Sequence, residues 1–122
     1  MIALVDACVA IDVLRGIPAA AAVLGAIDEP AASEIVRYEL LAGLKPGEED
    51  ATEALMELLL WVPVLEPVAR RAGELFRRYR AAYPGVDTAD FLIAATALEL
   101  DLPLVTRNVR HFPMLPGLEP AY

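Results

Sequence analysis

The chain has 122 residues, which is the length of a single domain. Hydrophobic residues make up 57 % of it and charged residues 23 %, and this composition excludes an intrinsically disordered chain. The formal net charge of −8 at pH 7 argues against non-specific binding to nucleic acid, because polyanions are held through phosphate contacts with Lys and Arg.

The first half of the chain is predicted to alternate short strands and helices. Met1–Val5 is a continuous apolar run, which is typical of a strand buried on both faces. Ser33 is a favourable N-cap for a helix that stops at Gly43. We expect, in chain order, a strand over 1–5, helices over 8–14 and 19–27, a short strand at 31–32, and helices over 33–43 and 48–60.

The second half continues this alternation. Pro63 predicts an edge position for a strand over 62–65, because proline has no N–H to donate to a neighbouring strand. The predicted helix over 67–83 has one apolar face, and its opposite face carries half of the ten basic residues of the chain. A helix over 87–100 and strands over 104–106 and 118–119 follow. Strands that alternate with helices predict an α/β sandwich with a mainly parallel sheet.

The side-chain inventory excludes several classes of chemistry. With one histidine, His111, a single chain cannot perform two-histidine acid–base catalysis. The lone cysteine, Cys8, excludes an internal disulfide and a zinc site built from cysteines, and it suits a reducing compartment. The chain has no nucleophile elbow, no Walker loop and no apolar run long enough to cross a bilayer. We therefore expect a soluble, cytoplasmic domain without a membrane partner.

Four oxygen-bearing side chains are predicted to meet at one edge of the sheet. Asp6 ends the first strand, Glu39 lies in the helix after the second, Asp90 begins the helix over 87–100, and Asn108 follows the strand over 104–106. Ligands of open parallel sheets bind beyond the carboxyl ends of the strands. Clustered carboxylates repel and take up protons unless a cation holds them, and oxygen ligands suit Mg²⁺ or Mn²⁺.

Four segments of the chain resemble, in order, motifs of the PIN-domain ribonucleases, and most closely the VapC toxins of toxin–antitoxin pairs. The segments are VDACVAIDVLRG, SEIVRYELLAG, DTADFLIAATALEL and LVTRNVRHF, and the match runs in order from Met1 to about Phe112. The resemblance implies a PIN-like three-layer α/β/α sandwich with a mainly parallel sheet, formed as one domain over residues 1–122. It also implies a metal-dependent endoribonuclease, the toxin of a toxin–antitoxin pair, with RNA as its substrate.

The same resemblance assigns a role to each candidate side chain. Asp6, Glu39 and Asp90 correspond to the acids that hold Mg²⁺ or Mn²⁺ in the family, and they form the catalytic set together with Asn108. Many family members have a fourth acid where this chain has Asn108. An amide oxygen can ligate a metal or its water but brings no charge. The absence of a fourth negative charge argues against a second, tightly held ion.

Further residues are predicted to position the substrate. The resemblance makes Thr106 a polar neighbour of the phosphate, and Arg107 and Arg110 flank Asn108 as candidates for phosphate contacts. Cys8 stands where the family more often has serine or asparagine, so the orientation of Asp6 is expected to be looser.

Each of these acids also has a purely structural interpretation. Asp6 would serve as the N-cap of the next helix, Asp87 and Asp90 as a capping pair, and Asn108 as the cap of a turn. Glu39 resists such an interpretation, because it lies among apolar residues and a buried glutamate without a partner is costly. Further structural expectations are a solvated Asp12, a non-catalytic His111 and Cys8 as a small buried hydrophobe.

Two functions from different classes are carried forward. The first is the endoribonuclease toxin, which would form a homodimer and bind a cognate antitoxin in a groove between the helices over 33–44 and 48–60. The expected groove residues are Leu55, Leu58, Leu59 and Trp61. The second is a non-catalytic PIN-like module that binds RNA or protein, in which Cys8 and Asn108 mark a degenerate acidic site.

Overall fold

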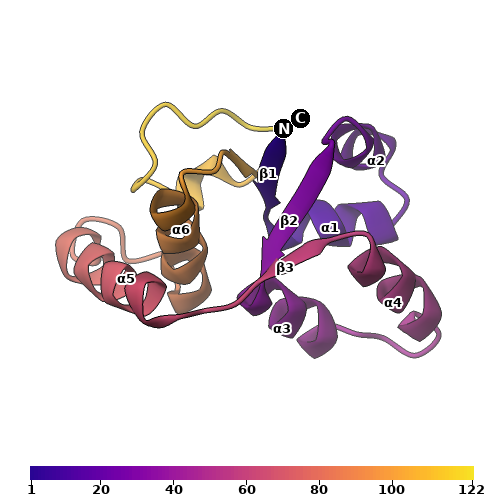
Figure 1. The fold of residues 1–122 in the computed structure, drawn as a ribbon, viewed down its shortest axis with the longest axis horizontal. Helices are drawn as coiled ribbons and strands as arrows, with labels where there is room; N and C mark the ends of the chain where they lie inside the picture. Colours follow the sequence, from indigo (N-terminus) through magenta and orange to yellow (C-terminus); the bar gives the residue numbers. More distant parts are fainter.

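The computed structural model describes all 122 residues, Met1–Tyr122. Four strands form one parallel sheet in the order β3-β2-β1-β4 (Figure 1). The strands are β1 (Ile2–Val5), β2 (Glu29–Ser33), β3 (Leu60–Val62) and β4 (Leu104–Val105). The helices are α1 (Ala7–Leu14), α2 (Pro18–Gly25), α3 (Glu34–Ala42), α4 (Glu49–Glu57), α5 (Glu66–Tyr79), α6 (Thr88–Leu100) and a short 3-10 helix over Val109–His111.

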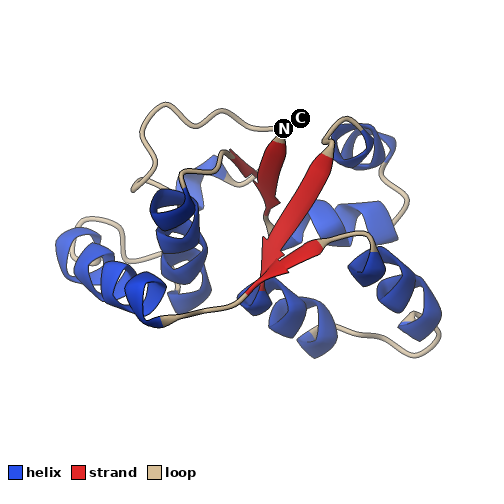
Figure 2. Cartoon of the chain, viewed as in Figure 1, coloured by secondary structure: helices blue, strands red, loops and turns tan.

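Helices cover both faces of the sheet. Helices α5 and α6 lie on one side, whereas α1 to α4 lie on the other (Figures 1 and 2). The prediction of a three-layer α/β/α sandwich with a parallel sheet is confirmed. The apolar run at the start of the chain forms β1 in the interior of the sheet, where Ala3, Leu4 and Val5 are fully buried.

The two helices of the smaller layer are fixed by different sequence features. Helix α5 is strongly amphipathic and buries Val68, Ala72 and Leu75. Helix α6 is apolar nearly all round, as expected for a helix packed between the sheet and α5. The Phe76 and Phe91 rings of these helices meet edge to face with their centroids 5.5 Å apart.

Several predicted boundaries are wrong, among them the end of the helix expected over 48–60, which stops at Glu57 before β3 begins at Leu60. Strand β3 covers Leu60–Val62 rather than 62–65, because Pro63 has no N–H to continue the ladder with β2. The predicted strand over 118–119 is absent, since the Leu118 N–H turns back to donate to the Leu115 carbonyl. The helix expected over 67–83 ends at Tyr79, and the following residues form turns before Pro84.

No helix of the structure is both long and apolar enough to span a lipid bilayer.

Candidate active site at the carboxyl edge of the sheet

A cavity of about 280 Å³ opens beyond the carboxyl ends of β1 and β4. The side chains expected to meet at this edge do so, because the cavity is lined by Asp6, Glu39, Asp90 and Asn108. Its other lining residues are Ala7, Cys8, Ile11, Arg15, Asp87, Arg107 and His111. Carboxylates therefore outnumber every other kind of polar group in the cavity.

Asp6 caps a helix and also faces the cavity. Its Oδ1 accepts a hydrogen bond from the Ala7 N–H at 2.8 Å, at the start of α1. Its Oδ2 accepts from the Thr106 hydroxyl at 2.7 Å and from the Cys8 thiol at 3.2 Å. The N-cap interpretation and the functional one are therefore compatible, and Thr106 fixes the carboxylate that Cys8 was expected to leave loose.

Asp87 and Asp90 form a capping box at the start of α6. The Asp90 N–H donates to Asp87 Oδ1 at 3.0 Å, and the Asp87 N–H donates to Asp90 Oδ2 at 3.1 Å. Burial raises the pKa of Asp90 to about 6, although the hydrogen bond from the Asp87 backbone works in the opposite direction. Asp90 Oδ2 also lies 3.6 Å from His111 Nδ1. The capping pair thus holds Asp90 at the cavity instead of removing it from the site.

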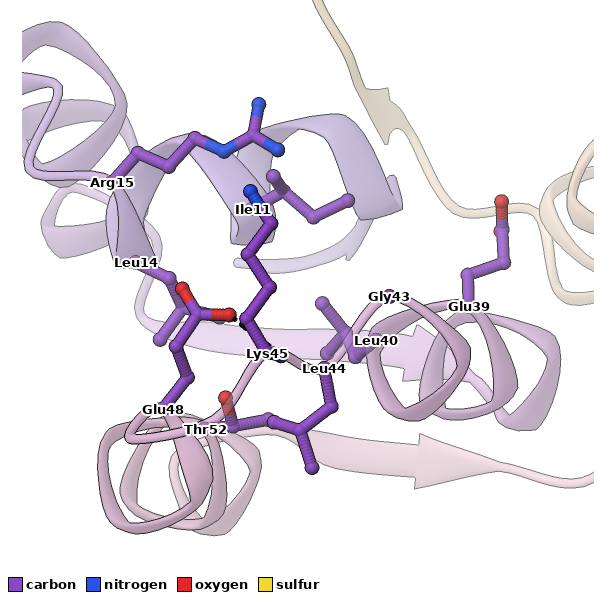
Figure 3. A pocket seen from close by; sticks show the side chains of 10 residues that line it. All are labelled: Ile11, Leu14, Arg15, Glu39, Leu40, Gly43, Leu44, Lys45, Glu48 and Thr52. Atoms are coloured by element: carbon purple, nitrogen blue, oxygen red, sulfur yellow. Dashed lines mark hydrogen bonds between the residues drawn. The ribbon is translucent and has the colours of Figure 1, made fainter.

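Glu39 is a half-buried acid of α3 without a hydrogen-bond partner in the chain. Its Oε1 is buried and makes no hydrogen bond, the only such side-chain atom found. Burial, followed by the nearby charges of Asp6, Asp87 and Asp90, raises the pKa of Glu39 to about 7. In Figure 3 this side chain projects from α3 well apart from Lys45 and Glu48. A polar atom left in this way costs stability, so it points to a ligand.

The donor set fits a hard divalent cation. All of its anionic groups are carboxylates, and a cation among them would relieve the repulsion that raises the pKa values of Glu39 and Asp90. No three Asp, Glu, Cys or His side chains lie close enough together in this structure to hold one metal ion. Carboxylate oxygens are the ligands that Mg²⁺ and Mn²⁺ prefer, and Mg²⁺ keeps several waters when it binds one or two of them.

The segment after β4 places the predicted substrate-positioning residues. Thr106 is fully buried, and its hydroxyl oxygen accepts the Asn108 N–H at 3.0 Å. Arg107 lines the cavity, but its Nε donates to Asp12 at 2.6 Å and its Nη1 donates to Asn108 Oδ1 at 3.1 Å. Arg110 is exposed and lines a neighbouring hollow rather than the acidic cavity. The structure therefore brings Arg107 to the acids but not Arg110.

The expectation of a solvated Asp12 is wrong. This side chain is buried, and Arg107 Nε and the Tyr122 hydroxyl each donate to its Oδ2 at 2.6 Å. The bond from Arg107, and then the bond from Tyr122, lower the pKa of Asp12 below its ordinary value. Sequence patterns do not reveal these contacts, because the partners lie 95 and 110 residues away along the chain.

Cys8 also differs from the expected small hydrophobe. It is half-buried, and its sulfur lies 3.3 Å from Thr106 Oγ1 as well as close to Asp6. Burial and then the charge of Asp6 raise the pKa of the thiol above its ordinary value. The sulfur is therefore a neutral hydrogen-bonding neighbour of Asp6, in the place where the resemblance leads one to expect a hydroxyl or an amide.

A second cavity, of about 80 Å³, adjoins the first (Figure 3). The two share Ile11, Arg15 and Glu39, and the second extends between α1, α3 and the start of α4. None of the leucines predicted to form a partner groove lines it. Leu55 and Leu59 are buried in the core, and Leu58 is exposed elsewhere. The cavity is lined instead by Leu40, Leu44 and Thr52, and the predicted partner groove stays a prediction.

The sequence and the structure were compared with those of known proteins, and each comparison found similar ones. The PIN domain family matches residues 3–116. The chain is 50 % identical to Ribonuclease VapC19 of Mycobacterium tuberculosis over 98 % of both chains, and 41 % identical to Ribonuclease VapC10 of the same organism over 98 % of this chain and 92 % of that one. A toxin–antitoxin complex from Klebsiella pneumoniae contains a similar chain, with a TM-score of 0.84, 28 % identity and 98 % of each chain covered.

Proposed function

The chain belongs to the PIN domain family, and on this premise we propose that it is an endoribonuclease, the toxin of a toxin–antitoxin pair. It hydrolyses phosphodiester bonds of RNA by attack of water on the phosphorus. The half-buried Glu39 carboxylate, whose buried Oε1 has no partner in a cavity shared with Asp6 and Asp90, carries this conclusion. A fold that needed Glu39 only for stability would have given this oxygen a partner.

A divalent cation, Mg²⁺ or Mn²⁺, is the cofactor that this cavity would bind. Asp6, Glu39 and Asp90 would hold it from three different elements, the end of β1, α3 and α6. When bound, the ion would supply positive charge beside the phosphate and lower the pKa of a water molecule. Thr106 holds Asp6 in place. Asn108 and Arg110 are proposed to position the RNA, and Arg107 to do so through its hydrogen bond to Asn108.

The proposed partners follow from the surfaces beside the acids. An antitoxin segment would occupy the second cavity and extend a basic side chain among the acids, because the two cavities share Glu39. A homodimer would cover exposed apolar side chains of α3, β3 and their surroundings, namely Tyr38, Leu41, Leu58, Leu60 and Leu65. Its RNA substrate would place such a toxin in the cytoplasm.

Residues 1–122 are proposed to act as one domain. The family match covers residues 3–116, and a single core of 26 buried residues draws on both helical layers. This arrangement supports one functional unit.

A cleavage assay tests the proposed activity. The purified chain, free of antitoxin, is incubated with a labelled structured RNA in Mg²⁺, in Mn²⁺ and in EDTA, together with the Glu39→Gln variant. Glu57→Gln serves as the matched control, because Glu57 is an exposed glutamate. We expect cleavage that requires metal, leaves 5′-phosphate ends, disappears in Glu39→Gln and persists in Glu57→Gln.

The opposite outcome would support a different protein. If no RNA in a broad panel is cut and calorimetry detects no Mn²⁺ binding, the chain is a non-catalytic module that binds RNA or protein.

A further inference from the structure

A continuous series of hydrogen bonds joins Tyr122 to the acidic cavity. The Tyr122 hydroxyl and Arg107 Nε both donate to Asp12, and Arg107 Nη1 donates to Asn108 Oδ1 at 3.1 Å. The Asn108 N–H then donates to Thr106, whose hydroxyl donates to Asp6. The proposed ribonuclease activity as such requires only the final step of this series.

The contact with Arg107 determines which end of the Asn108 amide is free. A guanidinium group has five N–H donors and no acceptor, so the amide atom beside it must be the oxygen. The amide nitrogen makes no hydrogen bond within the chain, and Asn108 lines the cavity that contains the acids. Asn108 therefore has two N–H donors free where it lines the cavity, whereas one of the two lone pairs of its oxygen is already taken by Arg107 and the guanidinium charge beside that oxygen disfavours a cation.

Asp12 prevents Arg107 from turning away. The Asp12 side chain is 10 % exposed, and both of its oxygens face the guanidinium, with the second contact at 3.5 Å. The Ala121 N–H donates to the Thr106 carbonyl at 2.8 Å, which ties the segment that carries Tyr122 to the end of β4. Because Asp12 also neutralises Arg107, the guanidinium orients Asn108 more effectively than it would attract a distant phosphate.

We propose that Asn108 is a catalytic hydrogen-bond donor to the RNA phosphate rather than a metal ligand, and that Arg107, Asp12 and Tyr122 are positioning residues that fix its amide in this orientation. The proposal rests on the ribonuclease function proposed above. Chemically it replaces a fourth negative charge, which would repel the substrate, with a donor that attracts it. It also leaves the metal to Asp6, Glu39 and Asp90 alone.

Nuclear magnetic resonance can observe this donor directly. The chain has one asparagine and no glutamine, so a ¹H–¹⁵N spectrum contains a single side-chain amide pair, that of Asn108. The probe is a pool of mixed-sequence phosphorothioate RNA added in Mg²⁺. We expect one proton of the pair to move downfield, together with the backbone N–H signals of Ala7 and Asp90 at the cavity.

The two other outcomes have different meanings. If Ala7 and Asp90 move while the Asn108 pair stays, RNA binds but the donor proposal is overturned. If none of these signals moves, RNA does not bind and the proposed function fails, and the donor proposal fails with it.

Kinetics of variants test the positioning residues. Asn108→Ala, which removes the donor without adding a charge, is expected to lower kcat about 100-fold. Tyr122→Phe and Arg107→Lys are expected to lower kcat about tenfold with little change in KM, because outer-shell partners act through the group they orient. Tyr83→Phe removes an exposed tyrosine hydroxyl and is the unchanged control.

A Mn²⁺ titration accompanies these assays. Wild type and Asn108→Ala are expected to bind the same number of ions. A variant that stays fully active would show that no donor acts at position 108, and one that binds fewer ions would show that Asn108 is a metal ligand; either result would overturn the proposal.

Discussion

The carboxylates at this edge of the sheet differ in whether the fold supplies them with a positively charged partner. In the acidic cavity, Glu39 and Asp90 lie near other acids and form no ion pair with Lys or Arg, and their pKa values are raised to about 7 and about 6. Asp12, on the other side of Arg107, accepts two strong hydrogen bonds, and its pKa is lowered. The fold is therefore able to neutralise an acid at this edge, and it leaves Glu39 and Asp90 without an ion pair to Lys or Arg.

This difference separates the roles of the two groups. The paired carboxylate of Asp12 strengthens the structure and holds a loop, whereas the unpaired carboxylates weaken the metal-free structure and gain from a cation. Function and stability thus place opposite demands on the same residue type within a few side chains of each other.

Removing a charge from the cavity is expected to have the largest effect. Asp90→Asn keeps an oxygen that can accept the Asp87 N–H, so the capping box and the fold survive. Metal-dependent RNA cleavage is expected to fall about 100-fold or more, because the cation loses a ligand. Cleavage rates at saturating Mg²⁺, with circular dichroism as the folding control, provide the check, and unchanged cleavage would remove Asp90 from the site.

A metal ion bound in the acidic cavity should stabilise the folded chain, because it neutralises the carboxylates that have no partner. At pH 8 with Mn²⁺ at about 100 times its dissociation constant, the free energy of unfolding is expected to rise by about 2.7 kcal/mol. The same addition to Asp6→Asn should change it little, since one of the three proposed ligands is gone. Urea unfolding in EDTA and in Mn²⁺ measures both, and an equal gain in the variant would refute a site at Asp6.

The pH dependence of the free energy of unfolding should reflect the raised pKa of Glu39. The folded-state pKa of Glu39, about 7, lies above its ordinary value of 4.5. The protonated form is therefore favoured by folding, and the stability that it contributes is complete below about pH 4.5 and is lost as the pH rises through 7. We expect the metal-free chain to lose about 2 kcal/mol between pH 5 and pH 8.

Glu39→Gln provides the matched control for this pH dependence. The variant cannot ionise at this position, so its urea midpoint should vary less over the same range. If the urea midpoints of wild type and Glu39→Gln vary with pH in the same way, the surroundings of Glu39 do not raise its pKa.

Removing the paired carboxylate of Asp12 is expected to have the smallest effect of these changes. The pH dependence of its contribution to stability is opposite in sign to that of Glu39. Asp12→Ala leaves Arg107 and Tyr122 without their shared acceptor, and because Arg107 is partly exposed we expect a loss of about 1–2 kcal/mol. The lowered pKa of Asp12 means that its contribution is present at neutral pH and is lost as the pH falls below about 3.8. Urea unfolding at pH 7 and pH 3 checks both points, and an unchanged stability would show that the pair does not hold the loop.

Local sequence patterns predicted most of the fold. The continuous apolar run over Met1–Val5 predicts a central strand, Ser33 predicts the start of α3, and the Asp87–Asp90 spacing predicts a capping box. These features depend on neighbours within four residues, so a single sequence contains the necessary information. The ends of β3 and α5 were misplaced because strand pairing and helix packing, which involve distant residues, decide where an element stops.

The candidate site divides along the same physical line. That Asp6, Glu39, Asp90 and Asn108 meet at one edge follows from the parallel order of the strands, and the sequence pattern suffices for it. The partners of Asp12, the orientation of the Asn108 amide and the unpartnered oxygen of Glu39 are decided only in the folded chain. Which charges are paired depends on contacts between residues up to 110 positions apart, and hydrophobic periodicity carries no record of such contacts.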